Sequence, residues 1–115
     1  MAEDRLKALL AIAETQPTEV MIWYGLANEY VKLERWPEAV EALRRTLAIN
    51  AEYTSAYQML GTALMKLGRR EEARLAWNEG VEVAARTGAW NARQHMERLL
   101  AGSNNEGEES GLCEE

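Results

Sequence analysis

Apolar residues recur along most of the chain at the three- and four-residue spacing of an amphipathic helix, and the strict alternation of a strand is absent. Pro17 cannot continue a helix, whereas Pro37 suits a first helical turn. Gly68 and Gly88 suit helix ends. The pattern therefore predicts six helices, at about residues 3–14, 19–33, 37–49, 55–67, 70–85 and 89–101.

The central helices repeat. When the chain is shifted by 34 residues, the segment that begins at Trp23 matches the segment that begins at Tyr57. In each copy an aromatic residue is followed by a leucine and then by a very small residue, and the next helix carries a fixed alanine. The repeated positions are Trp23, Leu26, Ala27, Tyr30 and Ala39 in the first copy, and Tyr57, Leu60, Gly61, Leu64, Ala73 and Trp77 in the second.

This pattern resembles the tetratricopeptide repeat (TPR) family, whose first helix reads W-x2-L-G-x2-Y. The resemblance implies an all-α fold: a short right-handed α-solenoid of helix-turn-helix repeats with terminal capping helices. It also implies that Gly61 and Ala73, like Ala27 and Ala39, lie where paired helices cross most closely. We expect a TPR domain over residues 1–102 and a disordered acidic tail over 103–115. The domain divides into an N-terminal helix (3–14), two repeats (20–53 and 54–87) and a capping helix (89–101).

Composition and charge narrow the range of functions. The net charge is −6, and five of the 19 acidic residues lie in the last ten positions, so the rest of the chain is close to neutral. No basic stripe with interleaved aromatic residues is present, so we expect no nucleic-acid partner. No segment approaches the roughly 20 apolar residues of a membrane helix. The charged N-terminus does not resemble a secretion signal, which makes a cytoplasmic location the expectation.

Candidate chemistry is sparse. Cys113 is the single cysteine and His95 the single histidine, so neither a metal site nor a cofactor is expected. Glu71 and Glu72 are adjacent and would point about 100° apart on a helix, which prevents them from acting as a carboxylate pair. No glycine spacing suits a phosphate-binding loop. We expect no enzymatic activity and no catalytic residue.

The TPR resemblance instead implies a recognition surface, because the first helices of successive repeats line a concave groove in that family. Residues one place after the aromatic anchor, and four and eight places beyond, share a helix face. Aligning the last helix with an offset of 32 residues extends the face into three ladders: aromatic, hydrogen-bonding and basic. The candidate groove residues are Tyr24, Asn28, Lys32, Gln58, Thr62, Lys66, Trp90, Gln94 and Arg98.

Two alternatives without a binding role stay open for these residues. The basic ladder is also compatible with an ordinary solvated face, and loops or the tail are able to cover Tyr24 and Trp90. TPR modules that hold the C-terminal carboxylate of heat-shock chaperones use a specific Lys/Asn/Lys/Arg set. Here only Asn28 matches that set, since Tyr24 and Met59 occupy two of the other places. That chaperone activity is therefore not predicted.

The sequence favours a non-catalytic protein–protein interaction module that binds a peptide or partner segment in the groove. An acidic segment or a free C-terminal carboxylate would suit the basic ladder. The alternative is a structural or assembly protein that acts through self-association, or through capture of a partner subunit on a solenoid face.

Overall fold

A computed structural model describes the backbone of residues 2–114 and the side-chain surroundings of residues 3–102. No strand occurs within residues 2–114, so the predicted all-α class is confirmed. The predicted ends of the first five helices agree with the structure within two residues. The helices are α1 (Ala2–Thr15), α2 (Val20–Lys32), α3 (Trp36–Ile49), α4 (Thr54–Lys66), α5 (Arg70–Thr87) and α6 (Trp90–Glu114).

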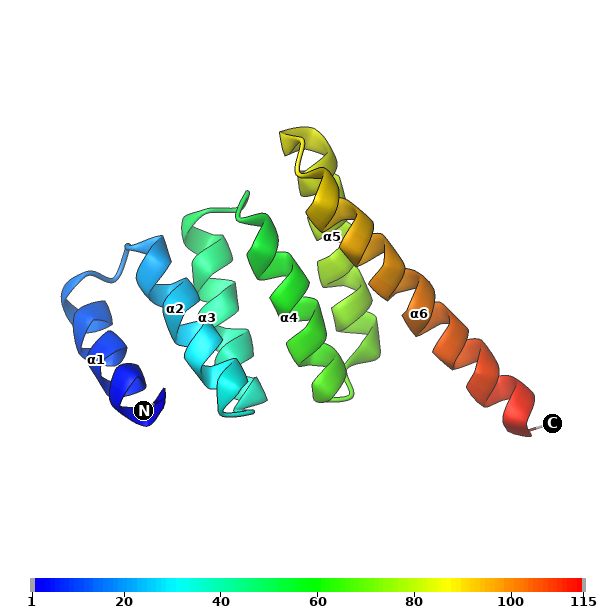
Figure 1. Cartoon of the computed structure of the whole chain (residues 1–115), viewed down its shortest axis with the longest axis horizontal. Helices are drawn as coiled ribbons and strands as arrows, with labels where there is room; N and C mark the ends of the chain where they lie inside the picture. The colour runs from blue at the N-terminus through cyan, green and yellow to red at the C-terminus, as the bar shows by residue number, and fades with distance from the viewer. Residues whose placement is uncertain (1, 115) are drawn as a thin grey trace.

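The helices form a row from the N-terminus to the C-terminus, with α3 and α5 behind α2, α4 and α6 in the view of Figure 1. Each helix packs against its neighbours in sequence, and α4 also contacts α6. The molecule measures 54 × 32 × 20 Å. Contacts between neighbouring helices in an elongated row define an α-solenoid, as predicted.

The aromatic residue at the start of each repeat ties its helix to the turn before it. The Trp23 indole Nε1 donates a hydrogen bond to the Pro17 carbonyl oxygen at 2.8 Å. The Tyr57 hydroxyl donates to the Ala51 carbonyl oxygen at the same distance. Both partners are six residues upstream, so two chemically different side chains make the same contact. This equivalence is direct structural evidence for the 34-residue repeat.

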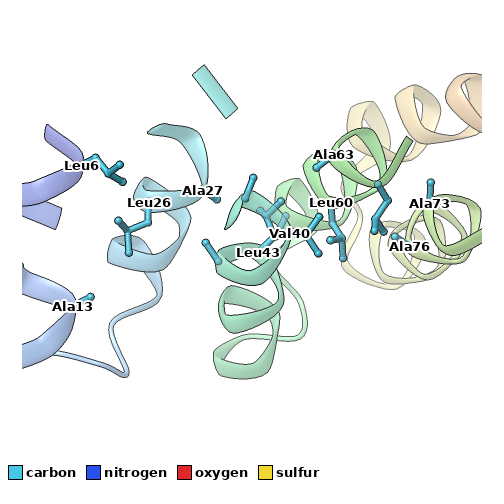
Figure 2. Close-up of a cluster of buried hydrophobic side chains, with 14 residues drawn as sticks. Leu6, Ala13, Leu26, Ala27, Val40, Leu43, Leu60, Ala63, Ala73 and Ala76 are labelled. Atoms are coloured by element: carbon cyan, nitrogen blue, oxygen red, sulfur yellow. The ribbon is translucent and has the colours of Figure 1, made fainter. Parts of the chain in front are cut away.

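Small residues let the two helices of each repeat approach closely. Ala27, Ala39 and Ala73 are fully buried in a core that runs from α1 to α5 (Figure 2). Gly61 on α4 is covered by the Trp77 side chain of α5, because a Cβ atom built on Gly61 would overlap the indole. The neighbour of Gly61 is therefore a side chain, whereas the sequence pattern suggested only a close crossing of helices.

The turns between paired helices have the same geometry in both repeats. Glu34 has φ +56° and Gly68, 34 residues later, has φ +77°. In each case the next backbone N–H donates to a carbonyl oxygen five residues upstream at 2.9 Å: Arg35 to Tyr30 and Arg69 to Leu64. The first repeat therefore places a glutamate where the left-handed backbone favours glycine.

The last helix closes the row and corrects one boundary. Met96 on α6 is fully buried, and its sulfur lies directly over Gly80 of α5. Ala89, Ala92 and Leu99 pack against the same cluster, in agreement with the 32-residue offset. The predicted end at Ala101 is wrong, because α6 continues as a helix to Glu114. The segment 103–115 contains no proline, so nothing in its sequence forces the helix to stop.

The contact between Gly61 and Trp77 generates the first prediction. Gly61→Ala should lower the free energy of unfolding by roughly 1–3 kcal/mol, because the added methyl overpacks against the indole. The first repeat places Ala27 and Leu43 at these two positions. In a Trp77→Leu background the same Gly61→Ala change should therefore cost about 1 kcal/mol less. Urea denaturation of the four proteins measures this coupling, and equal costs in both backgrounds would contradict the contact.

The turn at Glu34 generates the second prediction. A left-handed conformation costs a non-glycine residue about 1–2 kcal/mol, while glycine loses more chain entropy on folding. Glu34→Gly should therefore raise the melting temperature slightly, and the matched Gly68→Glu variant should lower it. Thermal unfolding followed by circular dichroism measures both, and a destabilised Glu34→Gly variant would be the opposing result.

Candidate binding face

The nine residues predicted to line the groove lie on three helices, which we call the α2/α4/α6 face. Each of these helices carries three of them. Five of the nine side chains are exposed, and the other four are half-buried. The exposed members are Lys32, Lys66, Trp90, Gln94 and Arg98, and the half-buried members are Tyr24, Asn28, Gln58 and Thr62.

The aromatic ladder is not continuous. The Tyr24 ring packs against Tyr53, with ring centroids 4.8 Å apart and planes tilted by 44°. Burial raises the pKa of the Tyr24 hydroxyl above its ordinary value. Trp90 is 59% exposed, and the Arg93 guanidinium lies over its ring at 5.6 Å. Tyr24 therefore packs on a neighbouring turn, while most of the Trp90 side chain is exposed.

The polar side chains in the middle of the face form hydrogen bonds to the backbone of their own helices. The Asn28 side-chain amide donates to the Tyr24 carbonyl oxygen, and the Thr62 hydroxyl donates to the Gln58 carbonyl oxygen. The Trp77 indole Nε1 reaches the same Gln58 oxygen at 3.1 Å. These bonds hold the side chains against their own helices. The Thr62 oxygen still has lone pairs with which to accept a hydrogen bond.

Of the three cations in the basic ladder, one is paired with an acidic side chain and two are not. Lys32 Nζ lies 3.4 Å from a carboxylate oxygen of Glu29. Lys66 Nζ lies over the Trp36 ring, 6.0 Å from its centroid, and has no carboxylate partner among residues 3–102. Arg98 likewise has no carboxylate partner in that range. Of the three cations in the ladder, Lys66 and Arg98 are therefore the two whose charge no acidic side chain of the described part compensates.

Glu29 is a residue that the sequence reading missed. It is 4% exposed, and one carboxylate oxygen lies between Lys32 and Arg5, the latter 3.6 Å away. The other oxygen has no hydrogen-bond partner in the described part of the chain. The signal was present in the repeat, because the equivalent position in the second copy is the buried Ala63. An acid in a position otherwise filled by alanine indicates a buried charge that needs a partner.

A pocket of about 250 Å³ opens between α4 and α6, and we call it the α4–α6 pocket. Three predicted groove residues meet there: Thr62, Lys66 and Arg98. Three apolar residues that the sequence reading did not assign to the site also line it. The full lining is Thr62, Met65, Lys66, Trp77, Arg98, Leu99 and Gly102.

The pocket combines apolar walls with positive charge. Trp77 is almost wholly buried beneath it, so the indole is fixed in place. Lys66 and Arg98 are exposed beside it. An apolar side chain would replace water against the indole, and an adjacent carboxylate would be attracted by the two cations. The sequence reading found the cations from their ladder, but the pocket depends on how α6 lies against α4.

Two other kinds of site find no geometry in the described residues. No three His, Cys, Asp or Glu side chains in that part of the chain are grouped to hold a metal ion. Within the same residues, no helix combines the length and apolarity needed to cross a membrane.

Comparison with known proteins connects this geometry to a family. No family model matches the chain. A TPR repeat-containing protein of Pseudomonas aeruginosa is 29% identical over 80 residues, which cover 70% of this chain and 76% of the relative. The solution structure of a Bordetella parapertussis protein is 29% identical with a TM-score of 0.75, over 90% of this chain and 87% of that chain. The TPR2B domain of yeast Sti1, solved in complex with pHsp70, shares the fold at 15% identity. Its TM-score is 0.84, over 91% of this chain and 84% of that chain.

Hairpins of helices in a 34-residue register, with a pocket between successive first helices, define an α-solenoid of the helical-repeat class. The chain is similar to the tetratricopeptide repeat family in its repeat pattern, in its sequence and in its fold.

The buried Glu29 generates the third prediction. Replacing both cations, in an Arg5→Met/Lys32→Met variant, should lower the free energy of unfolding by roughly 1–3 kcal/mol, because the buried carboxylate loses its partners. Adding Glu29→Ala should restore most of that loss, since alanine occupies the equivalent position in the second repeat. Chemical denaturation measures the series. Lys7→Met, at an exposed position with no ion-pair partner in the described part, is the control and should change little.

Proposed function

We propose that this protein is a non-catalytic interaction module that binds a segment of a protein partner on the α2/α4/α6 face. An apolar side chain of that segment enters the α4–α6 pocket, and a carboxylate beside it contacts Lys66 and Arg98. The carboxylate belongs to an Asp or Glu side chain or to a C-terminus. Trp90 adds an apolar contact elsewhere on the same face.

The observation that carries this proposal is the pairing of a preformed apolar pocket with two cations that have no carboxylate partner among the described residues. Polar side chains on an ordinary solvated face would not surround a fixed indole. The TPR2B domain of similar fold was solved in complex with pHsp70, which supports a protein as the kind of partner.

Lys32 has a different role in this proposal. Its ammonium group is held near Glu29, so reversing its charge would disturb the buried carboxylate as well as the face. A binding test that includes Lys32 would therefore mix loss of stability with loss of affinity. Lys66 and Arg98 give the cleaner test.

The fourth prediction tests the binding face by affinity capture from host lysate. A Lys66→Glu/Arg98→Glu variant should lose partners that the wild type retains. The charge-matched control is Lys7→Glu/Arg70→Glu, whose two positions are exposed on α1 and α5 and lie off the face. It should capture the same partners as the wild type. Identical capture by all three proteins would exclude this face.

With a partner identified, its dissociation constant gives the size of the effect. Reversal of both cations should weaken binding at least about twofold at low salt, because each partly exposed pair contributes about 0.2–1 kcal/mol. The difference between the wild type and the variant should shrink as salt rises.

The alternative role, assembly through self-association, is tested by light scattering over a range of protein concentrations. A monomer at high concentration supports the binding module, whereas a discrete dimer that the Lys66→Glu/Arg98→Glu variant retains would favour the structural role on another face.

A further inference from the structure

A second cavity lies on the side of the molecule formed by α3 and α5, behind the α2/α4/α6 face in the view of Figure 1. It has a volume of about 450 Å³ and opens between α3 and α5, with α4 as its floor, and we call it the α3–α5 pocket. We propose that this pocket is a second, independent binding site. It takes an apolar side chain of a partner polypeptide that carries a lysine or arginine close by.

The same cavity is almost closed in the first repeat. There a cavity of about 120 Å³ is lined by Trp23, Leu26, Tyr30, Glu38, Glu41 and Ala42, together with Leu10. Each of the first six has its 34-residue equivalent in the lining of the α3–α5 pocket: Tyr57, Leu60, Leu64, Glu72, Leu75 and Ala76. The two cavities are thus the same place in successive repeats, and their difference in volume comes from side chains.

Two substitutions between the repeats open the second cavity. Tyr30 and Trp23 fill the first one, whereas the smaller Leu64 and Tyr57 stand at the equivalent positions. Arg45 also contacts the wall of the first cavity, because its guanidinium lies over the Trp23 ring at 5.1 Å from the centroid. In the second repeat the position of Arg45 is taken by Glu79, which makes no such contact with an aromatic ring.

One position at the rim is a leucine in the second cavity and a glutamate in the first. Leu75 is 62% exposed and lines the pocket, and its equivalent in the first repeat is Glu41. An exposed leucine at the edge of an apolar cavity extends the apolar surface outwards. An occupant that fills the cavity and also covers Leu75 has to continue along the surface. This favours a polypeptide over a small enclosed molecule.

The charges at the rim indicate the sign of the partner. Arg44 lies 3.4 Å from Glu72, which also pairs with Arg69, so the two cations share one carboxylate. Glu79 has no ion-pair partner among residues 3–102. Burial raises the pKa of the nearby Tyr57 hydroxyl, and the charge of Glu79 adds to this effect while Arg86 opposes it. The lining of the pocket holds two carboxylates and one cation, and Glu79 is the carboxylate without an ion-pair partner in the described part. A basic residue beside the inserted side chain would pair with Glu79.

The test uses two capped helical peptides of about 14 residues, one built from Leu, Lys and Ala and the other from Leu, Glu and Ala. Amide resonances of the full chain are followed by NMR during titration. The Leu/Lys/Ala peptide should shift resonances around Leu47, Leu64 and Leu75 in a saturable manner. The Leu/Glu/Ala peptide should bind more weakly.

The first repeat supplies the variants. Leu75→Glu copies Glu41 at an exposed position and should weaken the Leu/Lys/Ala peptide by roughly tenfold, since it replaces an apolar contact with a charge. Leu64→Tyr copies Tyr30 and should fill the cavity and abolish binding. Glu79→Arg copies Arg45 and should remove the preference for the basic peptide. Because Leu75 is on the surface, its variant reports on binding even where Leu64→Tyr disturbs folding.

Several outcomes overturn the proposal. One is the absence of a saturable shift up to about 1 mM peptide, and another is unchanged affinity in the Leu75→Glu variant. Equal affinity for N-acetyl-leucine amide would indicate a small-molecule site instead. Shifts near Leu75 that depend on protein concentration without peptide would indicate a second copy of the chain. The Lys66→Glu/Arg98→Glu variant should bind the peptide like the wild type, so failure of the proposed function leaves this result intact.

Discussion

The packing of the Trp77 indole across Gly61 is the contact on which the rest of this molecule depends. It sets how closely α5 approaches α4, because no side chain larger than hydrogen leaves room for the ring. The same indole donates a hydrogen bond to the Gln58 carbonyl and forms a wall of the α4–α6 pocket. One side chain therefore joins the second repeat together and shapes the candidate binding site. The first repeat solves the same packing problem with Ala27 and Leu43, without providing an aromatic surface.

The two repeats show how one backbone arrangement produces different surfaces. Their turns, their aromatic anchors and their small packing residues are equivalent, so the helices occupy matching positions. The side chains between these fixed positions differ. Tyr30 and Trp23 close one cavity, while Leu64 and Tyr57 leave its counterpart open. Packing residues that recur in both repeats fix the positions of the helices. The surfaces differ where the side chains of the two repeats differ.

The two pockets also differ in charge. Lys66 and Arg98 line the α4–α6 pocket without a carboxylate partner among the described residues, whereas Glu79 lines the α3–α5 pocket without an ion pair in the same part of the chain. If both proposed sites are occupied, they would select different partner segments, or two segments of one partner. Two modest contacts linked in this way bind more tightly than either contact alone.

The sequence by itself determined the helices, the 34-residue register and the three helices that carry the candidate face. These features depend on local spacing: apolar residues at helical intervals, Pro37 at a helix start, and Gly68 and Gly88 at turns. The end of α6 escaped the same reasoning, because the Gly, Ser and Asn residues of this acid-rich segment lower its helix propensity without blocking a helix as proline does.

Only the tertiary structure decided which of the candidate residues act together. It showed that Tyr24 packs on Tyr53, that Lys32 belongs to the buried Glu29, and that Lys66 and Arg98 meet at one pocket. The first and third facts join residues from different helices or turns, and the buried Glu29 of α2 also contacts Arg5 of α1. Their distances depend on how closely the helices pack, which side-chain volumes such as those of Gly61 and Trp77 set jointly. Spacing along one helix fixes the direction of a side chain, but not what it meets across the gap.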